Sequence, residues 1–417
     1  MKLFLRKLRD EMVVLRNWLV PRIHDLLAVK KALSQWLRAR PFWRRALNLP
    51  APRTLSVQEW MDRRPAGDEY HLLVAGLTVD RKIPPTNDPG NLWYYEEKRH
   101  AEIDPAFVLK LQEGYVHGHA GAQVLTRDGN YLWDANIEDW LYFKHGFYMD
   151  SVLRLPAATR LDGTVAVLSH RNALNNFSHW VFDVLPRIGL LERTVGLRNI
   201  DHFLVCHRHK RYEWETLQQL GIPRENVVQL LPNSYFQAST VIFPSISRYN
   251  NFSHQPSTLE FLKKSFLPKS PSGKKRRLFI SRADASFRRL IGEAKLCRRL
   301  AAHGFEVITL AGVSLSDTAA LFSSAEMIVG PFGSGLMNIC FCPPGCLVVD
   351  ISAPEFYNPH HWYLSEESGL IYSAYFGNGG VMRPDRPLVS LTKDIVIDVD
   401  DCFRFIENRI NELAPVA

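Results

Sequence analysis

The second half of the chain alternates short apolar runs with amphipathic stretches. The apolar runs, which predict buried strands, are LFIS (278–281), FEVITL (305–310), EMIVG (326–330), CLVVDIS (346–352) and IYSAYF (371–376). The amphipathic stretches, which predict helices, are EAKLCRRLAAHG (293–304), SLSDTAALFSSA (314–325), GSGLMNICF (333–341), HHWYLSEESG (360–369) and DDCFRFIENRINEL (400–413). We expect Gly304 to end the first of these helices, and Ser314 or Ser316 to cap the second. This alternation predicts βαβ units and a parallel sheet covered on both faces.

The first half shows a looser form of the same alternation. Its predicted strands are VAVLS (165–169), HFLVC (202–206), VVQLL (227–231) and STVIFP (239–244), and its predicted helices are NNFSHWVFDVLPRI (175–188) and YEWETLQQLG (212–221). The segment LPKSPSGKKRR (267–277) has the composition of a linker. The sequence therefore predicts an α/β protein with two Rossmann-type halves, 51–266 and 267–417, that face each other across a cleft. The last helix can pack back on the N-terminal half.

The positive charge of the chain is concentrated in residues 1–50, which we expect to form a basic helical extension. This stretch holds twelve Lys and Arg residues against three Asp and Glu residues, whereas the whole chain has a net charge of +8. The remainder is almost neutral, which argues against nucleic acid as a partner. Apolar and basic residues interleave at helical spacing over residues 1–45, so this segment can lie on an anionic membrane surface. The alternative is a pair of helices packed on the body with a solvated basic face.

The sequence predicts neither an export signal nor a membrane span. Charges interrupt each apolar run near the start, and no stretch reaches the ~18 uncharged apolar residues of a transmembrane helix. We therefore expect a cytoplasmic protein, at most peripheral on the inner face of the plasma membrane, with reduced cysteines. Cys340, Cys342 and Cys346 lack zinc-ligand spacing, so we expect them to be small buried apolar residues.

The pentapeptide NNFSH occurs twice, at residues 175–179 and 250–254. The flanking sequences do not align, and Pro256 disfavours helix for its neighbour after the second copy, so we reject an internal repeat. We expect the second copy on a loop before the linker. A metal shared by His179 and His254 is disfavoured, because no carboxylate–histidine spacing surrounds the second copy.

The first copy leads from a predicted strand into a helix that carries Asn176, His179, Asp183 and Arg187. Residues four apart share one face of a helix. A histidine and a carboxylate on one face, at the carboxyl end of a strand, suit a general base and the group that orients it. The alternative is an exposed ion pair that stabilises the helix by about 0.3 kcal/mol. Pro186 is expected to kink or end this helix.

A second motif, SRADASFRRLIGE (281–293), places arginines at the end of a predicted strand. Arg282 follows the strand directly, and Arg288 and Arg289 precede the next helix. Guanidinium groups at this position suit a diphosphate, because arginine donates paired hydrogen bonds and keeps its charge. The alternative is a basic loop with solvated charges.

A third motif, IVGPFGSGLMN (328–338), is a glycine-rich turn between a strand and a helix. Glycines allow backbone N–H groups to approach an anion at a helix N-terminus, although tight packing alone also explains them. The glycine register differs from G-x-G-x-x-G, which disfavours a dinucleotide site and a dehydrogenase. Asp350 ends the next strand and suits ribose hydroxyls.

Together the three motifs resemble glycosyltransferase family 61, which includes bacterial capsular-polysaccharide-biosynthesis proteins. The motifs are Asn-x-x-His-Trp-x-x-Asp-x-Leu-Pro-Arg, Ser-Arg-x-Asp-x-x-x-Arg-Arg-x-x-x-Glu and Gly-x-x-Gly-x-Gly-Leu-x-Asn, in this order. The resemblance covers roughly residues 70–380. It implies a two-domain GT-B fold, with inversion at the anomeric carbon and without a tightly bound metal or other cofactor.

The resemblance also implies which residues form the site. It implies that Asn176, His179, Asp183 and Arg187 lie beside the reacting carbon. It implies that the donor diphosphate binds near Arg282, Asp284, Arg289, Glu293, Gly333, Gly335 and Asn338. Arg288, Ser334 and Asp350 lie in or after the same motifs and complete our set of donor-binding candidates.

The sequence departs from the family pattern at two positions. Phe332 stands where the family usually has histidine, and Gly292 stands where it often has asparagine. Without this imidazole, one contact that the family pattern implies for the nucleotide-sugar donor is in question, and the choice of donor can differ.

The expected function is that of an inverting hexosyl- or pentosyltransferase. It would move a sugar from a nucleotide-sugar donor to a glycan or lipid-linked glycan, in bacterial surface polysaccharide biosynthesis. Asp183 or His179 would remove the acceptor proton, with Asp183 slightly favoured if the helix points it into the cleft. Arg282, Arg289 and the helix after Gly335 would stabilise the leaving diphosphate. The alternatives are an inactive sugar- or nucleotide-binding protein of the same fold, and a protein that acts through its basic N-terminus.

Overall fold

The computed structural model describes most of the chain. The described residues are 29–51, 54–63, 66–119, 121–135, 152–245, 252–270, 273–354, 358–379 and 393–413. Residues 1–28 of the predicted basic extension and the first two residues of the second NNFSH copy lie outside these ranges. Within them, no helix has the length and apolar character needed to cross a bilayer.

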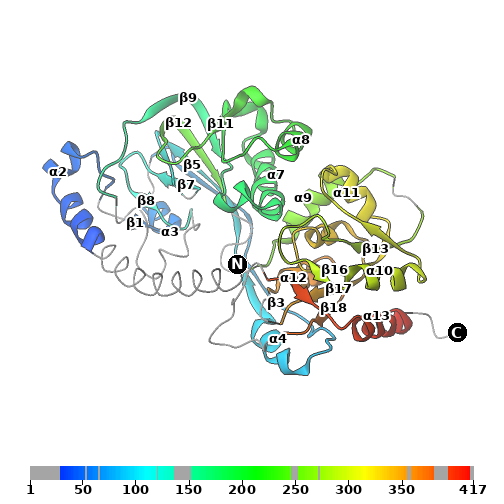
Figure 1. Cartoon of the computed structure of the whole chain (residues 1–417). Helices are drawn as coiled ribbons and strands as arrows, with labels where there is room; N and C mark the ends of the chain where they lie inside the picture. The colour runs from blue at the N-terminus through cyan, green and yellow to red at the C-terminus, as the bar shows by residue number, and fades with distance from the viewer. Residues whose placement is uncertain are drawn as a thin grey trace, which may run out of the picture.

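In the second half, five parallel strands form one sheet (Figure 1). The strands are β13 (Arg276–Ile280), β15 (Phe305–Ile308), β16 (Ala325–Pro331), β17 (Leu347–Ser352) and β18 (Ile371–Phe376). Their order in space is β15-β13-β16-β17-β18. β17 is buried along its whole length, because helices cover both faces of the sheet. The strands lie where the apolar runs predict them, and the α/β class is confirmed.

The helices of the second half also follow the sequence pattern. They are α10 (Glu293–Ala301), α11 (Leu315–Phe322), η7 (Leu336–Phe341), α12 (His360–Glu367) and α13 (Val399–Leu413). The Ser314 side chain caps α11 by accepting a hydrogen bond from the Asp317 N–H. The last helix, α13, packs on α10 of the same half, where the Arg299 guanidinium lies 4.4 Å from the Phe403 ring centroid. Cys340, Cys342 and Cys346 are buried.

The first half contains a larger mixed sheet of ten strands. The strands are β1 (Thr54–Leu55), β2 (Glu69–Val74), β5 (Ala106–Gln112), β6 (Tyr115–Gly118), β7 (Ala122–Leu125), β8 (Tyr131–Leu132), β9 (Thr159–Val167), β10 (His202–Val205), β11 (Val227–Gln229) and β12 (Tyr235–Pro244). The neighbours β12, β9, β10 and β11 are parallel, whereas β5 and β6 pair with β12 in antiparallel fashion. Only the parallel part corresponds to strands predicted from the sequence.

Most helices of the first half pack on or beside this sheet, and the two in residues 89–98 lie beside the second half (Figure 1). The main ones are α7 (Leu185–Thr194), α8 (Arg211–Gln219) and α9 (Pro256–Phe266), and the shorter ones are α2 (Pro41–Ala46), α3 (Val57–Met61), η1 (Pro89–Asn91), α4 (Leu92–Lys98), η3 (Arg171–Leu174), α6 (Phe177–His179), η4 (Trp180–Val184), η5 (Leu197–Asn199) and η6 (Arg224–Asn226). Residues 29–38 form a further helix before α2.

The predicted 175–188 helix is interrupted by one wider turn. α6, η4 and α7 follow one another without a break, and η4 has π-helical hydrogen bonding. Pro186 lies in the first turn of α7 and has no N–H to donate into the turn before it, which is consistent with the wider η4 turn. The proline therefore changes the helical pitch near Asp183 but does not end the helix.

A segment of the first half crosses to the second sheet. β3 (Leu77–Asp80) and β4 (His100–Ile103) form a separate two-stranded sheet that lies with α4 beside the second half (Figure 1). Thr86 pairs with Ala374 of β18, and the Asn87 side chain bonds both main-chain groups of Phe376. The 77–103 segment is therefore N-terminal in sequence but packs on the C-terminal sheet.

A buried ion pair ties these segments together. Arg81 donates to a Glu367 carboxylate oxygen over 2.8 Å, and the two side chains are 2% and 9% exposed. His254 of the second NNFSH copy is fully buried and contacts the other oxygen of Glu367 over 3.0 Å. The Arg81 guanidinium also lies 3.7 Å from the Tyr363 ring centroid. The second copy of the pentapeptide therefore contributes to packing, through its histidine.

This ion pair generates a stability prediction. Arg81→Ala leaves the buried Glu367 carboxylate without its cation, so we expect the free energy of unfolding to fall by about 3 kcal/mol in a urea titration. Arg99→Ala is the matched control, because Arg99 pairs with Asp80 on the same segment but at the surface. Its loss should change the free energy of unfolding much less, because solvent screens an exposed ion pair. Equal losses in the two variants would contradict a dominant role for the buried pair.

Candidate active site

The second sheet has one point at which the strand order reverses. The chain passes from β13 to β15 on one side and then to β16 on the other side of β13. In open α/β sheets, ligands bind outside the carboxyl ends of the two strands that flank such a point. β13 ends immediately before Ser281 and Arg282, and β16 ends immediately before Phe332 and Gly333. Two of the three sequence motifs therefore meet at this position.

The Arg282 side chain packs directly on Gly333. A Cβ atom at position 333 would overlap with the Arg282 Nη1 atom. The guanidinium is held by two main-chain acceptors, the Arg288 carbonyl at 3.2 Å and the Phe287 carbonyl at 3.0 Å. Burial lowers the pKa of Arg282, although Asp284 and Glu293 act in the opposite direction. The close approach of the cation thus leaves room for a side chain at position 333 only if the guanidinium moves.

Arg288 is a second cation at the same position and has a strained backbone. Its φ of 54° lies in the left-handed region, which costs a residue with a side chain roughly 1–2 kcal/mol. Burial, and secondly the neighbouring Arg282 charge, lowers the pKa of Arg288 to about 10. Two partly buried guanidinium groups that repel each other, one on a strained backbone, form a local environment that favours an anion.

The other polar residues of the arginine motif have different surroundings. Arg289 is exposed and forms an ion pair with Asp394 at 2.8 Å, and Asp284 is exposed. Glu293 accepts a hydrogen bond from Ser281 Oγ and a longer one from the Arg282 N–H at 3.4 Å. The structure therefore brings Arg282, Arg288 and Gly333 together, and places Arg289 in a surface ion pair.

The glycine-rich turn forms a hydrogen bond with the first half of the chain. Ser334 Oγ donates to Asn176 Oδ1 over 3.2 Å, which joins the third sequence motif to the first. Asn338 is 3% exposed, and its side-chain amide donates to the Gly335 carbonyl at 2.9 Å. Asn338 thus braces the turn from inside the fold.

Asp350 also lies inside the fold. Its side chain is fully buried and bonds to Tyr372 at 3.0 Å and to His361 at 2.8 Å. The sequence suggested that Asp350 binds ribose hydroxyls. In the structure its carboxylate is instead enclosed by protein groups. His361 in turn contacts the Gly333 carbonyl at 3.1 Å, and its ring lies 4.4 Å from the Phe332 ring. Asp350 therefore supports the glycine-rich turn through His361.

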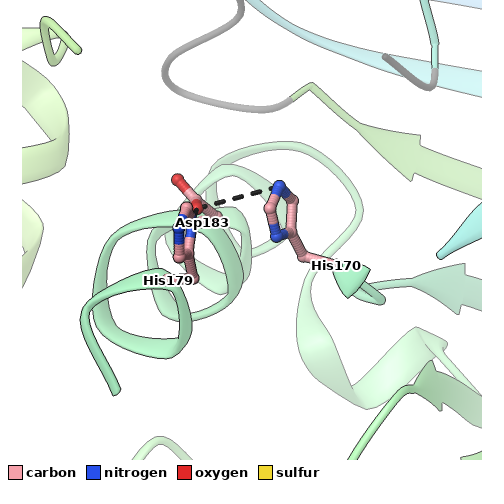
Figure 2. A group of neighbouring side chains, drawn as sticks. All are labelled: His170, His179 and Asp183. Carbon is pink, nitrogen blue, oxygen red and sulfur yellow. Dashed lines mark hydrogen bonds and ion pairs between the residues drawn. The ribbon is translucent and has the colours of Figure 1, made fainter. Parts of the chain in front are cut away.

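On the first half, a histidine–aspartate pair lies at the end of β9. Figure 2 shows His179, Asp183 and His170, with both histidines directed toward the carboxylate. His179 Nδ1 contacts Asp183 Oδ2 at 2.6 Å, and His170 Nε2 lies 3.8 Å from the same oxygen. The side chain of Asp183 is 1% exposed, whereas that of His179 is 24% exposed. The predicted pair is therefore formed, and its accessible member is the histidine.

Asn176 and Arg187 flank this pair in different ways. Asn176 caps the helix by accepting hydrogen bonds from the N–H and the hydroxyl of Ser178, at 3.0 and 2.8 Å. Arg187 is 1% exposed and donates to the carbonyls of Pro244 and Ser169 at 2.9 and 3.0 Å. It thus joins the carboxyl ends of β12 and β9. The wider η4 turn shifts Arg187 off the face that His179 and Asp183 share.

A cavity of about 300 Å³ lies between the two halves next to the Ser334–Asn176 contact. The first half lines it with Phe177 and with Tyr212 at the start of α8, whose rings meet edge to face at 5.1 Å. The second half contributes residues 310–313, together with Ser334, Gly335 and Asn338. Arg211, Glu215 and Thr318 also line the cavity, so its mainly apolar surface has polar groups both on α8 and on the glycine-rich turn.

One group of described residues has the composition of a metal site. The ligand atoms of His170, His179 and Asp183 all lie within 4.8 Å of one another. However, the 2.6 Å contact between His179 and Asp183 is a charge-assisted hydrogen bond, and it uses two of the atoms that an ion would need. The geometry therefore fits a base and its orienting carboxylate better than a closed metal site.

The chain is thus an α/β protein in which two partly buried arginines lie where the strand order reverses, and a His–Asp pair lies in the first half. The sequence model of the family Glycosyltransferase 61 matches residues 177–349, a range that contains His179, Asp183, both arginines and the glycine-rich turn. The matched region belongs to glycosyltransferase family 61, as the three motifs predict, and the protein is thereby assigned to the transferases. A comparison with curated proteins finds no match.

Sequence reasoning missed several residues around the site. His170 comes directly after the predicted strand VAVLS (165–169). Its position at the end of a strand could have marked it as a site residue. Tyr212 opens a predicted helix, and nothing in its local sequence indicates that it lines a cavity. His361 lies in a helix far along the chain, and its contact with Gly333 depends on tertiary packing.

Proposed function

We propose that the protein is an inverting glycosyltransferase with a GT-B arrangement, which transfers a sugar from a nucleotide-sugar donor to a glycan hydroxyl. The observation that carries this proposal is the Ser334–Asn176 hydrogen bond at 3.2 Å. This contact places the glycine-rich turn next to the helix that carries the His–Asp pair. Arg282 of the arginine motif packs on the same turn. A reaction between two substrates, one on each half, needs such a juxtaposition.

On the donor side, Arg282 and Arg288 bind the diphosphate. Burial, and secondly the neighbouring Arg282 charge, lowers the pKa of Arg288, and an anion between the two guanidinium groups offsets both effects. As the bond between the anomeric carbon and the diphosphate breaks, negative charge grows on the leaving oxygen. Fixed cations at that position stabilise the transition state more than the ground state. Arg289, which pairs with Asp394 at the surface, has a secondary role in this proposal.

On the acceptor side, His179 is the general base and Asp183 orients it. The hydrogen bond from Nδ1 to the buried Asp183 leaves Nε2 as the basic atom of the ring. Nε2 takes the proton of the acceptor hydroxyl while that oxygen attacks the anomeric carbon from the side opposite the diphosphate. Burial of Asp183 favours His179 over the slightly preferred sequence assignment of Asp183 as base.

The proposed reaction also has an expected acceptor, a cellular location and no metal requirement. The acceptor is a glycan or lipid-linked glycan of a bacterial surface polysaccharide, assembled on the cytoplasmic side. The reaction needs no tightly bound metal, because the arginines supply the positive charge at the leaving group and the ligand atoms of His179 and Asp183 are engaged with each other. Unchanged transfer after dialysis against EDTA is the corresponding test.

Separate substitutions distinguish the two candidate bases. His179→Ala should lower kcat by about 10²–10⁴-fold, because it removes the proton acceptor, while nucleotide affinity stays unchanged. Asp183→Asn should lower kcat by at least about tenfold, because it removes the charge that stabilises the protonated ring. The measurement is release of UDP or GDP from a panel of nucleotide sugars that is first screened by thermal shift. His303→Ala, on the far side of the second half, is the control.

Other outcomes of this experiment are equally informative. Near-wild-type turnover in both variants would contradict the site assignment. Loss in Asp183→Asn alone would make the aspartate the base. Tight nucleotide binding without any donor cleavage in the wild-type protein would favour the inactive binding protein of the same fold.

The contact between Arg282 and Gly333 gives a second prediction. Gly333→Ala should displace the Arg282 guanidinium, whose flexible end can move, so the free energy of unfolding should change by less than about 1 kcal/mol. The affinity for UDP or GDP, measured by calorimetry, should fall about tenfold because a charge-assisted hydrogen bond is lost. Gly273→Ala, with open space around the added methyl group, is the matched control. Unchanged nucleotide affinity in Gly333→Ala would refute the placement of the diphosphate.

A further inference from the structure

The start of the described chain carries an exposed apolar and aromatic surface. It consists of Val29, Leu33 and Trp36 on the helix 29–38, and of Phe42 and Trp43 on α2. These five side chains are between 41% and 72% exposed, and they include both exposed tryptophans among the described residues. Such a concentration of large apolar groups in eighteen residues is a sign of an interaction site. We call these five residues the N-terminal apolar surface.

The helix that carries this surface is oriented with its polar side inward. Val29, Leu33 and Trp36 are spaced i, i+4, i+7 and therefore lie on one face. On another face Ser34 is fully buried and donates to the Val152 carbonyl at 2.6 Å, and Arg38 is 1% exposed and donates to the Ala51 carbonyl at 3.0 Å. The helix is thus anchored to the body by buried hydrogen bonds, which keeps its apolar face directed away from the first sheet.

Basic residues surround the apolar surface. Lys30, Lys31, Arg40, Arg44 and Arg45 lie within it or beside it, and residues 26–58 contain no Asp or Glu. The Arg40 guanidinium lies 3.6 Å from the Trp36 ring centroid, and the Phe42 and Trp43 rings meet edge to face at 5.1 Å. A partner for this surface must therefore combine an apolar layer with negative charge.

We propose that the N-terminal apolar surface docks on a bilayer that contains anionic lipids. Tryptophan and phenylalanine insert at the boundary of headgroups and acyl chains, where an apolar ring has a polar neighbour. Arginine and lysine beside them bind lipid phosphates, and their long apolar stems extend toward the headgroups. The surface lies at the far end of the first sheet from the second half (Figure 1), so docking leaves the cavity between the halves accessible. This inference does not depend on the proposed function.

Vesicle binding by the full chain tests the proposal. We expect co-sedimentation with vesicles of phosphatidylcholine and phosphatidylglycerol, about tenfold weaker binding to phosphatidylcholine alone, and further weakening as salt is raised. The triple variant Trp36→Ala/Phe42→Ala/Trp43→Ala and the double variant Arg44→Glu/Arg45→Glu should each bind anionic vesicles at least about tenfold more weakly.

Two control variants match these changes elsewhere on the surface. Leu72→Ala/Leu231→Ala removes exposed apolar side chains, and Lys264→Glu/Arg298→Glu reverses exposed charges. Both should bind vesicles like the wild-type protein. Circular dichroism and the unfolding midpoint of each variant report whether it is folded, since the altered side chains are exposed or partly exposed.

Three results would overturn the proposal. Wild-type vesicle binding by the triple variant would exclude the aromatic residues as the docking surface. Equal binding to neutral and anionic vesicles would exclude the electrostatic part. Absence of vesicle binding by the wild-type chain, together with a dimer in light scattering that the triple variant abolishes, would show that the surface joins two copies of the chain.

Discussion

The close packing of Arg282 on Gly333 is the constraint on which the candidate site depends. It brings a cation to the place where the strand order of the second sheet reverses, and the guanidinium occupies the space that a side chain at position 333 would need. Two neighbouring residues contact this Arg282–Gly333 pair. Arg288 adopts a strained backbone so that its carbonyl meets the Arg282 guanidinium, and the His361 ring supports the Gly333 carbonyl from below. Local strain and desolvated charge are thus concentrated where an anionic ligand can offset both.

On the first half, a buried carboxylate contacts a partly accessible imidazole, and Asn176 at the start of the same helix contacts the glycine-rich turn. The wider η4 turn and Pro186 set the pitch of the helix at this place, so that Asp183 points into the protein and His179 lies at its edge. Arg187 joins the carboxyl ends of β9 and β12 beneath the pair. The two halves thus have different roles. In the proposed reaction one half supplies positive charge at the leaving group, and the other supplies the proton acceptor.

Much of the second half could be predicted from the sequence, because each buried parallel strand appears as an apolar run between capped helices. The strands from β1 to β8 were not predicted, because their runs are short or partly polar and depend on pairing with neighbouring strands, as β5 and β6 do with β12. Spacing predicted the contact between His179 and Asp183, and the motif match led to the arginines and glycines. Burial could not be predicted in the same way. Asp350 and Arg187 have residue types that suggest exposure, yet tertiary hydrogen bonds enclose both.

The two departures from the family pattern acquire a physical meaning in this fold. Gly292 has a φ of 102° at the start of α10, a left-handed conformation that asparagine and glycine tolerate better than other residues. A Cβ atom at this position would lie 2.8 Å from the Val399 Cγ2 atom, so both the backbone and the packing suit glycine. Phe332 removes an imidazole from the turn, but His361 of α12 lies against the Phe332 ring and bonds the adjacent carbonyl. An imidazole still reaches the glycine-rich turn, from another helix. Both positions therefore have packing contacts of their own, Gly292 with Val399 and Phe332 with His361.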